Sequence, residues 1–234
     1  MKASLHLLAG LTLLLGARSA AQVPLAAKPA TPGAFAKANV RFEQNATDGD
    51  MEVVFEAKAG AEGLAKLIVT SPDGRTVADF TAPDASTLGM RQFRFESPEP
   101  QDVKSLKAAY PEGVYTFSGT TVSGARLQGK STLRHRLPAT VSFVQPPAGG
   151  QDVAIQNLQI TWTPVKEVAA YVVYIEQDEL DVHVTAQITG TAVAFEVPDG
   201  FLAPATEYTL GIGTVSVEGN ISYVETSFTT AGTE

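Results

Sequence analysis

One aromatic pair constrains the fold of this chain more than any other feature. The chain's single tryptophan, Trp162, is followed forty residues later by the segment from Leu202 to Tyr208 (LAPATEY). In a two-layer β-structure, a tryptophan on one strand fills the space between the sheets, and a corner tyrosine hydrogen-bonds back to upstream backbone. These two features favour a β-sandwich in the C-terminal half.

The rest of the chain has the same character. Short runs of alternating apolar and polar residues recur between Gly, Pro, Asn and Asp, and no helix of normal length is expected. The predicted fold class is all-β, with two tandem β-sandwiches after a signal peptide. In the first sandwich we expect strands at 39–43, 51–57, 65–70, 76–80, 91–96, 113–121 and 127–136.

Turn chemistry supports the first module. In Ser71–Gly74 (SPDG), proline stands where φ near −65° is needed and glycine where a positive φ is tolerated, which predicts a hairpin. The segment Tyr110–Tyr115 (YPEGVY) then introduces a strand in which Tyr115 and Phe117 alternate with polar neighbours. These two segments resemble the immunoglobulin-like modules of bacterial surface and appendage proteins, a resemblance that carries no function.

The second module has a longer set of matching positions. They are Ile160 and Trp162 on a second strand, Tyr171, Val173 and Ile175 on a third, Leu202 to Tyr208 before a sixth, and Ser227 to Thr230 on the last. Over 138–231 these positions resemble a fibronectin type III domain. The resemblance implies that the third, sixth and seventh strands are neighbours. Relatives serve as spacers, adhesins, receptor ectodomains and accessory modules, so the fold does not fix the function.

The N-terminus has the three-part pattern of a secretory signal peptide. Lys2 precedes an apolar run from Leu7 to Gly16, and the small residues Ser19 and Ala21 precede the expected cut. The run is too short to span a membrane, and no other span is expected. The predicted organisation is therefore a signal peptide at 1–21, an Ala/Pro-rich tether at 22–37, an immunoglobulin-like sandwich at 38–137 and a fibronectin type III-like domain at 138–231. We expect export to the periplasm, cell surface or medium.

Charge and cysteine content exclude several classes of function. The formal net charge is −8, and an acidic surface repels nucleic acid. The chain has no cysteine, so disulfides and thiol catalysis are excluded. His135 and His183 lie outside any nucleophile or metal motif, so no catalytic, metal or cofactor site is predicted.

Two acidic segments, 48–52 (DGDME) and 176–181 (EQDELD), leave calcium binding open as an alternative to solvated turns. For the second segment, a further alternative is a charged connection that discourages edge-to-edge strand pairing.

Strand parity suggests one candidate binding face. If Tyr171, Val173 and Ile175 point inward, Tyr174 points outward, because side chains alternate between the faces of a strand. The same count turns Gly211, Gly213 and Tyr223 outward, so two tyrosines would flank an open glycine floor. Such rings can stack on a sugar or accept a partner strand; alternatively, they cover the glycines and protect a weak strand.

Three classes of function remain. We favour a non-enzymatic secreted or envelope protein that binds another envelope or extracellular protein or holds a spacing. The alternative is a carbohydrate-recognising accessory protein that binds polysaccharide through Tyr174 and Tyr223. An enzyme is disfavoured because no motif places a carboxylate pair, nucleophile or metal set.

Overall fold

The structure is a computed structural model that describes residues 31–82, 84 and 89–232. The regular secondary structure of these residues is almost entirely β-strand, with one short helix. In the N-terminal half the elements are β1 (Gly33–Ala34), β2 (Lys37–Asn45), β3 (Met51–Lys58), β4 (Leu64–Thr70), β5 (Thr76–Thr81), β6 (Gln92–Glu96), α1 (Val103–Ala109), β7 (Gly113–Thr121) and β8 (Arg126–Leu133). Every strand expected in this half is present within a few residues of its predicted bounds.

The secondary-structure elements described in the C-terminal half are all strands. They are β9 (Phe143–Gln145), β10 (Gly150–Val153), β11 (Gln159–Trp162), β12 (Val168–Gln177), β13 (Val182–Thr189), β14 (Ala194–Glu196), β15 (Glu207–Ser216) and β16 (Ile221–Thr230). The all-β fold class is confirmed.

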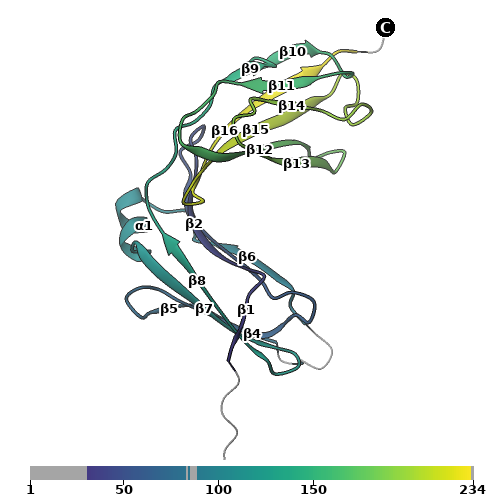
Figure 1. The fold of residues 1–234 in the computed structure, drawn as a ribbon. Coiled ribbons are helices and arrows are strands. Elements are labelled where there is room, and N and C mark those ends of the chain that lie inside the picture. Colours follow the sequence, from purple (N-terminus) through teal and green to yellow (C-terminus); the bar gives the residue numbers. More distant parts are fainter. Residues whose placement is uncertain (1–30, 83, 85–88, 233–234) are drawn as a thin grey trace, which may run out of the picture. The chain divides into compact units, whose positions relative to one another are not determined.

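The first hydrophobic core lies between two layers. One layer is the five-stranded sheet β1-β8-β7-β4-β5, and the other is formed by β2, β3 and β6 (Figure 1). On β7, Tyr115 and Phe117 are fully buried, as the alternation predicts. The expected hairpin is the antiparallel pair β4 and β5, and Gly74 in its turn has φ +85°.

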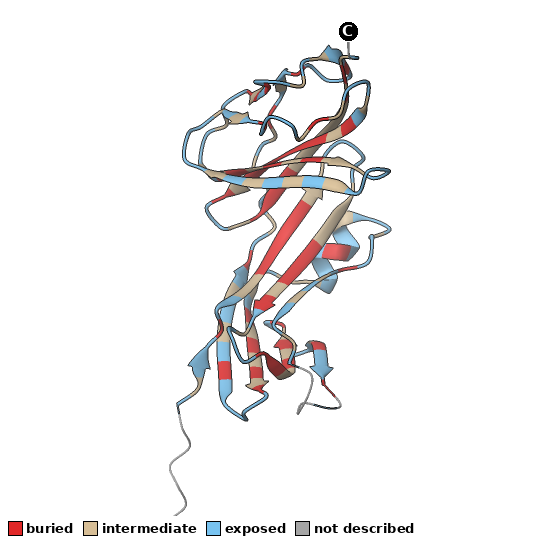
Figure 2. Cartoon of the chain, turned by 90° about the vertical axis from the view of Figure 1, so that its right-hand side faces the viewer, coloured by how far each residue is buried: buried red, intermediate tan, exposed pale blue. Residues whose placement is uncertain are grey.

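The second core lies between β14-β11-β9 and β13-β12-β15-β16. Trp162 and Tyr171 meet inside it with ring centroids 5.3 Å apart. The Tyr208 hydroxyl accepts a hydrogen bond from the Ala203 backbone N–H over 2.8 Å, the corner contact that the sequence predicts. The expected adjacency of the third, sixth and seventh strands is found as β12-β15-β16. Figure 2 shows buried residues along the strands of the sheets, and on β12 between Tyr171 and Glu176 they alternate with half-buried ones.

A sheet connection that the sequence does not predict joins these two regions. Strand β16 pairs in parallel with β2, so strands beside both cores belong to one eight-stranded sheet. The registered pairs are Ile221 with Glu43, Ser222 with Gln44 and Tyr223 with Asn45.

The N-terminal prediction needs one correction. The signal segment and residues 22–30 lie outside the described residues, but the end of the predicted tether is structured. Gly33 and Ala34 form β1 against Leu127 and Gln128 of β8, and Phe35 is buried in the first core. A hydrophobic ring seated between strands, rather than Ala/Pro composition, decides the conformation of this stretch.

Helix α1 is the other element absent from the prediction. Asp102 caps it by accepting a hydrogen bond from the Ser105 N–H over 2.8 Å, and Leu106 packs into the first core. Within the described part of the chain, no helix has the length and apolar character needed to cross a membrane.

Candidate functional site

The four residues of the predicted face do lie together. Tyr174 on β12 stands opposite Gly211 on β15, and Gly213 on β15 stands opposite Tyr223 on β16. The two tyrosine rings meet edge to face, with centroids 5.9 Å apart and planes at 63°. Strand parity therefore placed these side chains on one face of the sheet.

The face is not the open glycine floor that the sequence suggests. A Cβ added at Gly211 would overlap the ring of Tyr174, and one added at Gly213 would lie 2.5 Å from the ring of Tyr223. Both glycines are buried, and both rings are half-buried. The rings thus cover the glycines, the second of the two arrangements that the sequence allowed, because a ring that packs over missing side chains leaves no bare backbone.

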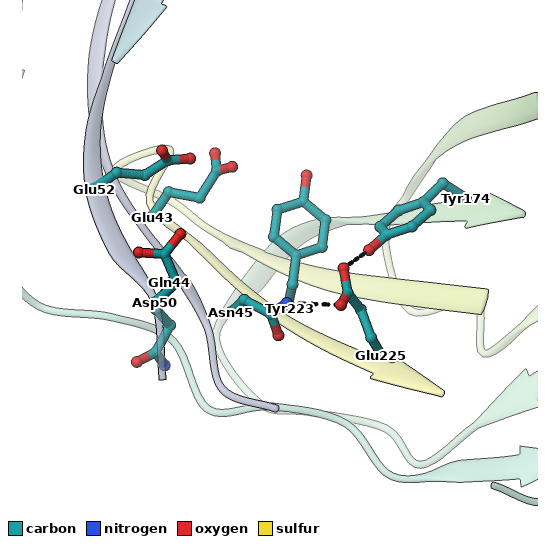
Figure 3. A pocket seen from close by; sticks show the side chains of 8 residues that line it. All are labelled: Glu43, Gln44, Asn45, Asp50, Glu52, Tyr174, Tyr223 and Glu225. Carbon is teal, nitrogen blue, oxygen red and sulfur yellow. Dashed lines mark hydrogen bonds between the residues drawn. The ribbon is translucent and has the colours of Figure 1, made fainter. Parts of the chain in front are cut away.

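Residues of the N-terminal half complete the site. Because β2 pairs with β16, the tyrosines face Glu43, Gln44 and Asn45 of β2 across a hollow of about 280 Å³. Asp50, Glu52 and Glu225 line the same hollow. Figure 3 shows Tyr174, Tyr223 and Glu225 on one side, and Glu43 and Glu52 on the other.

Glu225 is the centre of the hydrogen bonds in this hollow. The Tyr174 hydroxyl donates to one of its carboxylate oxygens, and Asn45 Nδ2 donates to the other over 2.7 Å. The Glu225 backbone N–H donates to Thr47 Oγ1, also over 2.7 Å. Burial, together with the bond to Glu225, raises the pKa of Tyr174, and burial raises the pKa of Tyr223 to about 12. Both hydroxyls are therefore protonated at neutral pH.

A network of ion pairs borders the hollow on the side of β2 and β3. Arg41 Nε lies 2.7 Å from Glu43, and Arg41 Nη1 lies 2.6 Å from Glu56, which also pairs with Lys37 at 2.7 Å. Arg41 and Glu43 are both buried. Burial opposes ionisation of Glu56, but Lys37 and Arg41 outweigh it and lower the pKa of Glu56.

Glu52 differs from the other carboxylates of this network. Burial, followed by the like charges of Glu96 and Glu43, raises the pKa of Glu52 to about 7. Its opposing charge is Arg94, whose Nη2 is 3.8 Å away. The hollow therefore contains a carboxyl group that gains and loses a proton near neutral pH, a property also found in purely structural ion-pair networks.

Asp48 of the first acidic segment and His135 make local contacts. Asp48 accepts hydrogen bonds from the Asp50 N–H at 2.9 Å and from Asn45 Nδ2 at 3.2 Å. Its carboxylate therefore stabilises the turn between β2 and β3. Among the residues that the structure describes, no group of three or more His, Asp or Glu is placed to hold a metal ion. His135 Nε2 lies 2.8 Å from the Tyr110 carbonyl oxygen, and its ring packs on Phe42.

Sequence reasoning missed the contribution of β2 and β3 to the site. One signal was available, since the charged pairs 41/43, 52/56 and 94/96 on the predicted strands at 39–43, 51–57 and 91–96 are each an even number of residues apart, which places each pair on one face of its strand. No local signal shows that this face adjoins Tyr223. That adjacency comes from pairing between β2 and β16, about 178 residues apart.

No family model and no curated protein matches the chain. Among solved structures it is similar to the fibronectin(III)-like modules of CbhA from Clostridium thermocellum, with 11% identity and a TM-score of 0.34, covering 85% of this chain and 93% of that one. It is also similar to a two-domain fibronectin type III segment of chicken tenascin, with 17% identity and a TM-score of 0.32, covering 84% of this chain and 99% of that one. A third neighbour is the BSP domain of a biofilm associated protein, with 16% identity and a TM-score of 0.29, covering 85% of this chain and 30% of that one.

Proposed function

We propose that the protein is an exported, non-enzymatic binding and spacing protein that presents its recognition surface where its two modules, 38–137 and 138–231, meet. The observation that carries this proposal is the pairing of β16 with β2, which sets Tyr223 beside Asn45. Through this pairing the candidate face belongs to both modules. A surface of this kind forms only while the modules keep one arrangement.

Buried hydrogen bonds support a fixed junction. The Asn220 side chain, 1% exposed, accepts from the Phe42 N–H and donates to the carbonyl oxygens of Arg134 and Arg136, each over 2.8 Å. Ser222 Oγ accepts from Gln44 Nε2 over 2.9 Å. Modules that move independently share few such bonds, so this pattern favours a spacer of defined geometry.

The shape of the face favours a protein partner over a polysaccharide. A sugar ring stacks on a flat, open aromatic surface, whereas these rings stand at 63° and each covers a glycine. The polar hollow beside them, with Asn45, Gln44 and four carboxylates, suits a partner that brings hydrogen-bond donors. The signal-peptide pattern at 1–21 supports a location in the periplasm, at the cell surface or outside the cell.

The test is a capture experiment with the chain from Gln22 onward as bait. Envelope and secreted fractions of the source organism are cross-linked to the bait, and bound proteins are identified by mass spectrometry. The test variant is Tyr174→Ala with Tyr223→Ala. The matched control is Phe80→Ala with Val114→Ala, which removes two exposed apolar side chains elsewhere.

We expect a protein that is captured by the wild-type and control baits and lost by the tyrosine variant. Circular dichroism verifies that each variant is folded. Equal capture by all three baits contradicts the proposed surface. Tyrosine-dependent binding to a polysaccharide array, with no protein captured, would instead favour the carbohydrate alternative.

A further inference from the structure

Strand β13 has one free side. It is the last strand of the eight-stranded sheet and pairs with β12 without a register shift, from Gln177 opposite Val182 to Ala170 opposite Thr189. Within 31–82, 84 and 89–232, no strand pairs with its other side. A free strand edge presents unpaired N–H and C=O groups that can bond to another extended segment.

The other edge strands are protected and β13 is not. Charged residues interrupt β6, through Arg94 and Glu96, and β5, through Asp79. Strand β10 has four residues, one of them Asp152, and β1, β9 and β14 have three residues or fewer. Strand β13 (VHVTAQIT) has eight residues and contains no Lys, Arg, Asp, Glu or Pro. Proteins usually shield edges by short length, charge or proline, so the longest edge strand in the described sheets is also the least shielded. The acidic segment 176–181 lies largely in the preceding turn rather than on this edge.

The side chains of β13 form two distinct rows. Val182, Val184 and Ile188 are half-buried against the second core, whereas His183, Thr185 and the other alternate residues are exposed. An added strand with apolar side chains on its inner face would cover the first row. Its polar side chains would lie beside the second row.

Charge indicates the chemistry of the added strand. Residues 138–231 contain eleven Asp and Glu but a single basic side chain, Lys166. Glu176 pairs across the sheet with His183, and the exposed Asp178, Glu179 and Asp181 stand at one end of β13. A second copy would bring like charges together, while a basic segment would be attracted.

From these observations we propose that β13 is a strand-addition site for an extended segment of a partner protein in which apolar residues alternate with Lys or Arg. The segment hydrogen-bonds to the free backbone edge, and its basic side chains face the acidic turn and Glu176. This site is separate from the hollow at Glu225 and goes beyond the proposed function, because it does not require the junction between the modules.

The probe is a capped peptide of the same length as β13 in which valine alternates with lysine and threonine. One control peptide has glutamate for lysine, and a second is N-methylated at alternate residues so that it cannot pair as a strand. Binding to the chain from Gln22 onward is measured by fluorescence anisotropy, and hydrogen exchange reports protection of the β13 amides. The test variant is Thr185→Lys, and the charge-matched control is Thr132→Lys, at an exposed position on β8.

We expect the lysine peptide to bind and to protect β13, and the two control peptides not to bind. Since a like charge placed next to a cross-strand partner costs up to about 1 kcal/mol, Thr185→Lys should weaken binding by about five-fold and Thr132→Lys by less than about two-fold. Thr185→Glu should tighten binding.

Four results overturn the proposal. They are absence of binding by the lysine peptide, equal binding of the N-methylated peptide, equal weakening by the two lysine variants, and a dimer in sedimentation equilibrium that Thr185→Lys dissociates. The last result would assign the edge to a second copy of the chain.

Discussion

The side-chain oxygen of Asn220 accepts a hydrogen bond from the backbone N–H of Phe42 over 2.8 Å, joining residues 178 positions apart. The same amide donates to the carbonyl oxygens of Arg134 and Arg136, on the segment that leads from the first core to the second. One buried side chain thus connects β2, this segment and the turn between β15 and β16. It fixes the strand pairing on which the candidate face depends.

Replacing this amide should destabilise the protein. Asn220→Ala leaves one N–H and two carbonyl groups without their partner, and each unsatisfied buried group costs about 1–3 kcal/mol before water enters, so we expect a net loss of about 2–4 kcal/mol. Urea denaturation followed by fluorescence and circular dichroism measures it. Gln159→Ala, at an exposed position on β11, is the control and should change stability by less than about 0.5 kcal/mol. Equal stability of the two variants would show that the Asn220 bonds contribute nothing net.

Tyr174 and Gly211 should be energetically coupled. A methyl group at Gly211 overlaps the Tyr174 ring, so Gly211→Ala should destabilise by about 1–3 kcal/mol through overpacking. In the double variant with Tyr174→Ala the overlap is gone, so its loss of stability should be smaller than the sum of the two single-variant losses by at least about 1 kcal/mol. A double-mutant cycle measured by thermal and chemical denaturation gives this coupling. Additive losses would mean that the ring moves aside freely.

Stability should fall as the pH rises through the titration of Glu52. Its pKa is raised from the ordinary value of 4.5 to about 7, so between these values the folded chain holds a proton that the unfolded chain has released. The folded state is therefore favoured at the acidic end of this range, and we expect about 1–2 kcal/mol to be lost from pH 5 to pH 8 after allowance for solvent screening.

Glu52→Gln should remove most of this dependence and stabilise the protein at pH 8. Glu207→Gln, at an exposed position on β15, is the control and should leave the slope unchanged. The pKa of Glu56 is shifted in the opposite direction, and its effect appears at lower pH. A carboxyl group with a lowered pKa in the folded state adds stability that is lost only when the pH falls below the ordinary pKa of the group. Denaturation midpoints measured from pH 5 to pH 8 give the dependence of stability on pH for each variant. If Glu52→Gln kept the dependence of the wild-type protein, Glu52 would not be its source.

Phe35 should be essential to the first core despite lying in a stretch rich in Ala and Pro. Its ring packs beside Gly119 and Gly129, where an added Cβ would meet it at 2.7 Å and 3.3 Å. Phe35→Ala should cost about 3–4 kcal/mol, as for other buried phenylalanines. A chain that begins at Lys37 should lose at least as much in urea denaturation, whereas one that begins at Pro32 should match the chain from Gln22. If the chain that begins at Lys37 were as stable as the longer chains, residues 32–36 would not contribute to the first core and would act only as a tether.

The sequence was informative wherever structure is set by local pattern. Alternation placed Tyr171, Val173 and Ile175 inward and Tyr174 outward, since side chains on a strand alternate regardless of what the strand pairs with. The Ser71–Gly74 turn was readable because proline and glycine restrict φ at individual residues. The corner bond of Tyr208 followed from a motif only a few residues long.

Contacts between segments that are distant in the sequence could not be predicted from local pattern. Pairing of β2 with β16 depends on two strands whose own alternation is equally compatible with other neighbours, and it decides that Glu43 and Asn45 face Tyr223. The insertion of Phe35 and the raised pKa of Glu52 depend likewise on what surrounds each side chain. An all-β chain, the strands of its first half other than β1, and the inward or outward direction of strand side chains could be predicted from the sequence pattern. Which distant strands became neighbours depended on the folded arrangement, because burial and charge interaction follow distances in space rather than position along the chain.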